Sequence, residues 1–142
     1  MSAEQIIVER TYPVPSEKVW QAITEHDKLK EWFFKLPDFR AEPGFEFVIA
    51  DNNGRDKHLC RITEVVPGKK LVFSFSNISA PGMSDVTYEL FDEGENTRLK
   101  LTHTGLETFP LDQPGYMKKN YEEGWTYLFG TALKNYFEQN NS

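Results

Sequence analysis

Two kinds of residue in this sequence could do acid–base chemistry: a histidine in a strand-like segment and a pair of adjacent glutamates. His103 follows Leu99 and Leu101 at a spacing of two, which places all three side chains on one apolar strand face. An imidazole titrates near neutral pH, so His103 is a candidate general base. The alternative is a core histidine that is hydrogen-bonded to a neighbouring hydroxyl or carboxylate. Because the sequence shows no second group that would activate it, we predict no catalytic residue and expect His103 to orient a ligand.

The two glutamates, Glu122 and Glu123, stand directly before Gly124-Trp125 in the last apolar segment. A carboxyl group that turned into the core would have a raised pKa and could act as an acid. Together with His103 it would support a cavity-based enzyme of the cyclase or hydrolase kind. Solvated carboxylates on the polar side of a helix are the alternative, and we expect this second arrangement.

No set of residues has the spacing of a metal or disulfide site. His26 and His58 lie far apart and form no His-x-x-x-His pair. Cys60 is the single cysteine, so an intrachain disulfide cannot form, and its place in a strand-like run favours a buried, inert thiol. We predict no metal and no cofactor.

Length, charge and hydropathy limit the class of protein. The 142 residues suit one domain, which we assign to residues 1–142, and a formal net charge of −6 without a basic stripe argues against nucleic-acid binding. No apolar run approaches the ~18 residues of a membrane span, and the N-terminus lacks the basic and apolar regions of a signal peptide. We therefore expect a cytoplasmic protein.

The segments that position these residues change from strand to helix, then to sheet and back to helix. Residues 5–12 predict a strand, Ser16 is placed to cap a short helix, and apolar residues at helical spacing predict a second short helix over about 27–33. From 39 to 104 the apolar period is two and turn sequences recur, which predicts an antiparallel meander. Its apolar face is predicted to carry Phe45, Phe47, Ile49, Leu71, Phe73, Phe75, Val86, Tyr88, Leu90, Leu99, Leu101 and His103.

The last apolar segment predicts one long helix over about 113–139. Its apolar residues recur three and four apart and form a single stripe, which consists of Met117, Tyr121, Trp125, Leu128, Phe129, Ala132, Leu133, Tyr136 and Phe137. A curved sheet with one apolar face needs a cover, and this helix is the only predicted element long enough to supply it. Gly124 costs a helix about 1 kcal/mol relative to alanine, and we expect it to leave room beneath the helix for an aromatic ring or a ligand.

Several short motifs, taken in order, resemble one known family. They are YPVPSEKVW at 12–20, LKEW at 29–32, PGFEF at 43–47, ITEVVPGKKL at 62–71, SDVTYEL at 84–90 and LTHTGL at 101–106, followed by Gly124-Trp125. With these motifs the chain resembles the activator of heat-shock-protein-90 ATPase homologue-like family, which is part of the START-like (SRPBCC) superfamily. The resemblance extends over nearly the whole chain.

This resemblance implies an α+β helix-grip fold of the START-like or Bet v-like kind. In that fold a curved seven-stranded antiparallel sheet wraps a long C-terminal helix, and two short helices follow the first strand. Members of the superfamily bind apolar ligands between sheet and helix, and some catalyse reactions there. The chaperone-activating members imply a further alternative, a chaperone-related interaction module.

The aromatic residues of the two inner faces define the predicted ligand site. It consists of Trp20, Phe45, Phe47, Phe73, Phe75, Tyr88, His103, Tyr121, Trp125 and Phe129. Asn77, Tyr88, Thr102 and His103 would be the polar groups that orient a ligand. The alternative is that the same rings simply fill the interior and serve stability. We expect a small soluble protein that binds an apolar or aromatic small molecule in a cavity between sheet and helix.

Overall fold

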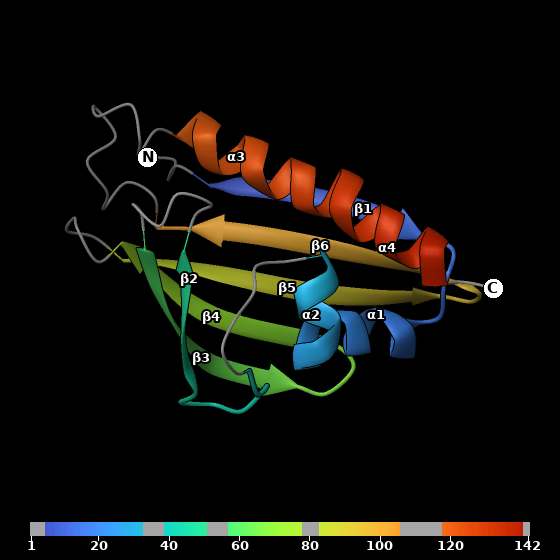
Figure 1. Cartoon of the computed structure of the whole chain (residues 1–142), viewed down its shortest axis with the longest axis horizontal. Helices are drawn as coiled ribbons and strands as arrows, with labels where there is room; N and C mark the ends of the chain where they lie inside the picture. Colours follow the sequence, from blue (N-terminus) through green and yellow to red (C-terminus); the bar gives the residue numbers. More distant parts are fainter. Residues whose placement is uncertain (1–4, 33–38, 51–56, 78–82, 106–117, 141–142) are drawn as a thin grey trace.

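The computed structural model describes residues 5–32, 39–50, 57–77, 83–105 and 118–140. Within these residues an antiparallel sheet of six strands has the order β1-β6-β5-β4-β3-β2. The strands are β1 (Ile6–Tyr12), β2 (Glu46–Ala50), β3 (Lys57–Val66), β4 (Lys70–Asn77), β5 (Ser84–Glu93) and β6 (Asn96–Thr104). β2 to β6 therefore form the predicted meander, and β1 is added to its far side by pairing with β6 (Figure 1).

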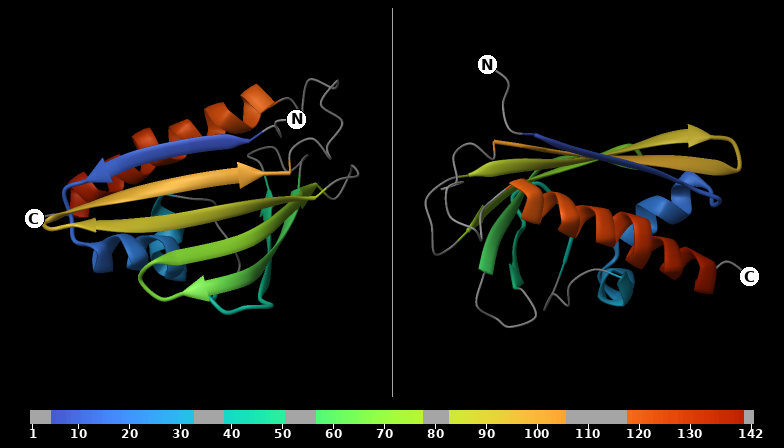
Figure 2. Two further views of the ribbon diagram at one scale, coloured as in Figure 1. Left: turned by 180° about the vertical axis from the view of Figure 1, so that it is seen from behind. Right: turned by 90° about the horizontal axis from the view of Figure 1, so that it is seen from above.

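Two short helices and one long helix lie on the same side of this sheet. α1 (Ser16–Thr24) and α2 (His26–Trp32) follow β1, and the segments α3 (Lys118–Tyr127), η3 (Leu128–Ala132) and α4 (Leu133–Asn140) form one continuous helix near the C-terminus. Figure 2 shows the sheet curving round this C-terminal helix, with α1 and α2 beside the α4 end. The α+β helix-grip fold is thus confirmed.

Buried residues alternate with exposed or half-buried ones along β4, β5 and β6, and this gives the sheet one apolar face. Every residue predicted to face inward from β2, β4, β5 and β6 is buried, and Phe45, which lies just before β2, is half-buried against the core. Tight turns keep the strands in register. At the β3–β4 turn the amide of Lys69 donates to the carbonyl of Val66 at 2.9 Å, and Gly68 has φ +77°, a backbone conformation that favours glycine.

A single π-helical turn interrupts the C-terminal helix where it passes β1. The amide of Leu133 bonds to the carbonyl of Leu128, five residues back, instead of to the carbonyl of Phe129. The hydroxyl of Tyr12 on β1 supplies a donor to the Phe129 carbonyl at 2.7 Å. Because Tyr12 is buried, this bond satisfies a carbonyl that the wider turn removes from the α-helical pattern.

Two sequence predictions need correction, and a third is tested only in part. The described residues contain six strands where seven were predicted. Pro15, and not Ser16, is the N-cap of α1, since Ser16 already has helical geometry and no side-chain cap bond forms. The first residues of the predicted long helix, 113–117, lie outside the described residues, and the helix is described from Lys118 to Asn140.

Gly124 does not lie over a ring or a cavity, contrary to our expectation. The residue is exposed, and a Cβ atom added to it would have no atom within 4 Å outside its own helix backbone. Successive helical residues are rotated by about 100°. Gly124 therefore faces solvent although Trp125, the next residue, is buried in the core.

Replacing Gly124 with alanine is expected to raise the free energy of unfolding by about 1 kcal/mol. The gain comes from helix propensity alone, because the new methyl group meets open space. Urea denaturation of the two proteins measures it. Gly130→Ala is the matched control in the same helix, where an added Cβ would lie 3.3 Å from Arg10 Nε and the gain should be smaller. A destabilised Gly124→Ala protein would contradict this account.

Candidate functional site

An aromatic cluster occupies the space between the inner face of the sheet and the C-terminal helix. Seven of the predicted site residues belong to it and are buried: Phe47, Phe73, Phe75, Tyr88, His103, Trp125 and Phe129. They come from five different elements, β2, β4, β5, β6 and the C-terminal helix. The predicted site residues on the sheet and on this helix are thus brought together by the fold.

Ring contacts run through the cluster without interruption. Tyr88 is at its centre, with ring centroids 5.5 Å from Phe73, 6.2 Å from Trp125 and 5.6 Å from Phe129. His103 lies 6.0 Å from Trp125 and 5.2 Å from Phe75, in edge-to-face geometry. Edge-to-face pairs at these distances are favourable beyond the area that they bury, so the cluster contributes to stability whatever else it does.

His103 is held in a hydrogen-bond chain that determines its protonation. The indole Nε1–H of Trp125 lies 3.0 Å from His103 Nδ1, and His103 Nε2 lies 2.7 Å from the hydroxyl of Ser84. Because an indole nitrogen can only donate, Nδ1 must accept, and the proton of the neutral ring is on Nε2. Nε2–H then donates to Ser84 Oγ, whose own hydroxyl donates to the carbonyl of Phe75 at 2.8 Å.

This chain keeps His103 neutral. The residue is fully buried, and burial, with a smaller contribution from the charge of His58, lowers its pKa to about 3. Its one basic lone pair, on Nδ1, already accepts the proton of the Trp125 indole. A general base needs that lone pair for a substrate proton, so the arrangement favours a structural or orienting role.

The hydroxyl of Tyr88, unlike the ring nitrogens of His103, takes no part in this hydrogen-bond chain. The side chain is 3% exposed, and burial, followed by the neighbouring Cys60, raises its pKa well above the ordinary value. Among the described residues no hydrogen bond engages the Tyr88 hydroxyl. Cys60 is itself fully buried, and burial raises its pKa as well, which fits the inert thiol expected from the sequence.

The remaining predicted residues are placed less centrally. Trp20 and Phe45 are half-buried and pack against the edge of the core. Thr102 lies between two inward-facing residues of β6 and therefore points to the other face of the sheet, so its predicted role in orienting a ligand is wrong. The side chains of Tyr121 and Asn77 lie outside the described residues.

Glu122 and Glu123 are both exposed. They take the solvated arrangement that we expected, and neither carboxylate enters the core. In the described part of the chain, no three side chains of His, Cys, Asp and Glu gather as a metal-binding group would. None of the helices described there is long and apolar enough to cross a membrane.

Sequence reasoning missed Ser84, Trp32 and Tyr12. Ser84 begins β5 opposite Phe75 and is fully buried, and the spacing of two before Val86 could have identified it as inward-facing. Trp32 donates its indole N–H to the carbonyl of Ala22 at 2.8 Å and meets Phe129 at 6.4 Å. Nothing local marks these last contacts, because they join separate elements.

The family of the chain follows from a match over most of its length. A family model described as "Activator of Hsp90 ATPase homolog 1-like protein" matches residues 13–138. The chain belongs to this family. No curated protein matches the chain in sequence.

Solved structures share the fold of this family member. DynU16, a protein in the dynemicin biosynthetic locus, has a TM-score of 0.81 and 23% identity over 98% of this chain and 49% of its own. The chain thus spans about half the length of DynU16. Protein MLL2253 from Mesorhizobium loti has a TM-score of 0.79 and 25% identity, over 95% of this chain and 97% of its own. CalU16 from Micromonospora echinospora has a TM-score of 0.74 and 26% identity, over 93% of this chain and 74% of its own.

Proposed function

We propose that this protein binds a neutral, apolar or aromatic small molecule in its interior, between the sheet and the C-terminal helix. One observation carries the proposal: the buried ring of Tyr88 lies at the centre of the aromatic cluster, and its hydroxyl forms no hydrogen bond with another described residue. The nearby polar groups of His103, Ser84 and Trp125 bond to one another. A hydrogen bond from this hydroxyl to a ligand acceptor would contribute roughly 0.5–1.5 kcal/mol to binding.

The surroundings of Tyr88 define the chemistry of this ligand. The raised pKa keeps the phenol protonated, so it donates, and the ligand needs a carbonyl or ether oxygen to accept. The rings of Phe73, Trp125 and Phe129 surround the phenol and offer aromatic contacts. A formal charge on the ligand would be costly to bury among them. DynU16 is a protein of a biosynthetic locus, and this supports a small organic molecule as the ligand class.

Titration with Prodan, a neutral naphthyl ketone whose emission responds to its surroundings, tests the proposal. We expect a saturable, blue-shifted signal from the wild-type protein. Tyr88→Phe removes only the hydroxyl and should weaken binding about 2- to 10-fold, the equivalent of one net hydrogen bond. Tyr127→Phe is the matched control, because this phenol is 59% exposed on the same helix that carries Trp125.

The result that would contradict the proposal is equally direct. Absence of saturable binding, together with native mass spectra of protein from its own cells that show no bound small molecule, would leave the cluster as a packed core. Equal affinities for the wild-type and Tyr88→Phe proteins would remove Tyr88 from the site.

A second candidate function, a protein-interaction module, is supported by the outer face of the sheet. Val48 and Leu59, which pair across β2 and β3, are 37% and 40% exposed, and Met83 is 56% exposed. A hollow of about 610 Å³ lies there, and Leu59, Arg61 and Met83 line it. Exposed apolar patches of this kind occur at partner surfaces. Loss of cosedimentation with purified Hsp90 on Leu59→Asp would favour this function, and no cosedimentation at all would exclude this partner.

A further inference from the structure

A separate groove of about 500 Å³ lies between β1 and the C-terminal helix. Its apolar lining includes Tyr12 and Phe137, and its charged lining consists of Arg10, Lys134 and Glu138. The volume lies in the range of small-molecule sites. The three charged side chains do not belong to the aromatic cluster, so this groove differs in chemistry from the neutral interior.

The π-helical turn and Gly130 shape this groove. The turn places Phe129 where its carbonyl accepts from Tyr12, so the helix is held against β1 at this point. The next residue, Gly130, has no side chain to project from the helix. A Cβ atom there would lie 3.3 Å from Nε and 3.6 Å from Nη2 of Arg10. The absence of that atom lets the guanidinium lie close to the helix at the edge of the groove.

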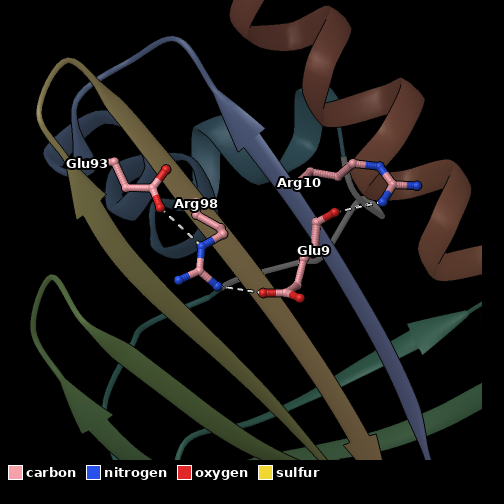
Figure 3. Close-up of polar contacts among 4 residues, drawn as sticks. All are labelled: Glu9, Arg10, Glu93 and Arg98. Carbon is pink, nitrogen blue, oxygen red and sulfur yellow. Dashed lines mark hydrogen bonds and ion pairs between the residues drawn. The ribbon is translucent and has the colours of Figure 1, made fainter.

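Two neighbouring arginines on the sheet differ in how their charge is matched. Arg98 donates to the carboxylates of Glu9 at 2.6 Å and Glu93 at 3.2 Å. Arg10 donates to the backbone carbonyl of Glu9 at 2.7 Å, and within the described residues no carboxylate pairs with it. Figure 3 shows both contacts of Glu9, with the Arg10 side chain extending toward the C-terminal helix and Arg98 lying over the sheet.

The other charges of the groove largely balance each other. Lys134 lies 3.6 Å from Glu138 one helical turn away. The groove therefore presents an apolar floor, one balanced ion pair and one guanidinium whose charge no described carboxylate matches. A guanidinium has several N–H donors in a planar fork, and this geometry suits a carboxylate.

We propose that this groove binds a small amphiphilic monocarboxylate. The apolar body of the ligand packs against Phe137 and the edge of Tyr12, and its carboxylate accepts hydrogen bonds from Arg10. A single negative charge fits because one cation is available, whereas a dianion would face the carboxylate of Glu138. This site takes a charged ligand and is independent of the neutral ligand proposed for the interior.

Titration of the isotope-labelled protein with sodium 2-naphthoate, followed by amide NMR shifts, tests the inference. We expect the largest shifts at Arg10, Thr11 and Gly130, with affinity that falls as salt is added. Arg10→Gln should weaken binding at least about tenfold, since a charge-assisted bond is lost. Arg61→Gln removes the same charge from the hollow on the outer sheet face and should leave the affinity unchanged.

A second variant and a second probe complete the test. Gly130→Leu places a side chain in the groove and should abolish binding, while circular dichroism and urea melts check that the fold is retained. The uncharged analogue 2-naphthalenemethanol should bind at least about tenfold more weakly than the carboxylate. Equal affinity in the Arg10→Gln protein would overturn the inference, as would shifts that Tyr88→Phe abolishes and Arg10→Gln does not.

Discussion

Acidification from about pH 6.5 to pH 4 is expected to lower the free energy of unfolding by about 3 kcal/mol through His103 alone. The pKa of this buried imidazole is about 3 in the folded protein, below the ordinary value of 6.5, mainly because burial disfavours the charged ring. The unfolded chain therefore takes up a proton that the native protein does not. The sign follows directly: the contribution is fully present above about pH 6.5 and is lost as the pH falls toward 3.

Urea denaturation at a series of pH values measures this slope, which for one proton is about 1.4 kcal/mol per pH unit. His103→Asn should lower stability at pH 7, because the shorter amide cannot replace both bonds, to Trp125 and to Ser84. Below about pH 6 its stability should fall less steeply than that of the wild type. His26→Asn, which removes an imidazole from the start of α2, is the comparison. Equal changes of slope in both variants would assign the acid sensitivity to other groups.

Truncation of Trp125 to alanine should cost about 3–5 kcal/mol, the range for large buried aromatic side chains. The indole is 5% exposed and lies against Tyr88, Phe129 and His103, so its removal leaves a void among rigid rings. It also removes the donor to His103 Nδ1 and leaves a buried acceptor without that partner.

Two further variants separate these contributions. Trp125→Phe retains a ring but loses the N–H group, and we expect roughly 1–3 kcal/mol of destabilisation. Tyr127→Ala removes an aromatic side chain that is 59% exposed on the same helix and should change stability by no more than about 0.5 kcal/mol. Similar losses for Trp125→Ala and Tyr127→Ala in urea melts would show that the cluster does not depend on the indole.

Local periodicity was sufficient to predict the elements and their buried faces. The period of two in β4, β5 and β6 reflects the pleat of a strand, and the three-and-four spacing near Trp125 reflects the turn of a helix. Both are properties of a few consecutive residues. The family resemblance rested on short motifs in order, and the match over residues 13–138 confirms it. The prediction for Gly124 was wrong because this residue lies one position before Trp125 of the apolar stripe, and the helix rotates it away from the core.

Contacts between distant residues were decided by the tertiary structure. Ser84, His103 and Trp125 form one hydrogen-bond chain only because β5, β6 and the C-terminal helix meet at a particular register and depth. Tyr12 and Phe129 are 117 residues apart, and no local pattern indicates that one would complete the hydrogen bonding of the other. The inward direction of His103 was thus determined by the sequence by itself. Its tautomer, its lowered pKa and the groove beside Arg10 depend on which side chains the folded chain places within a few ångströms.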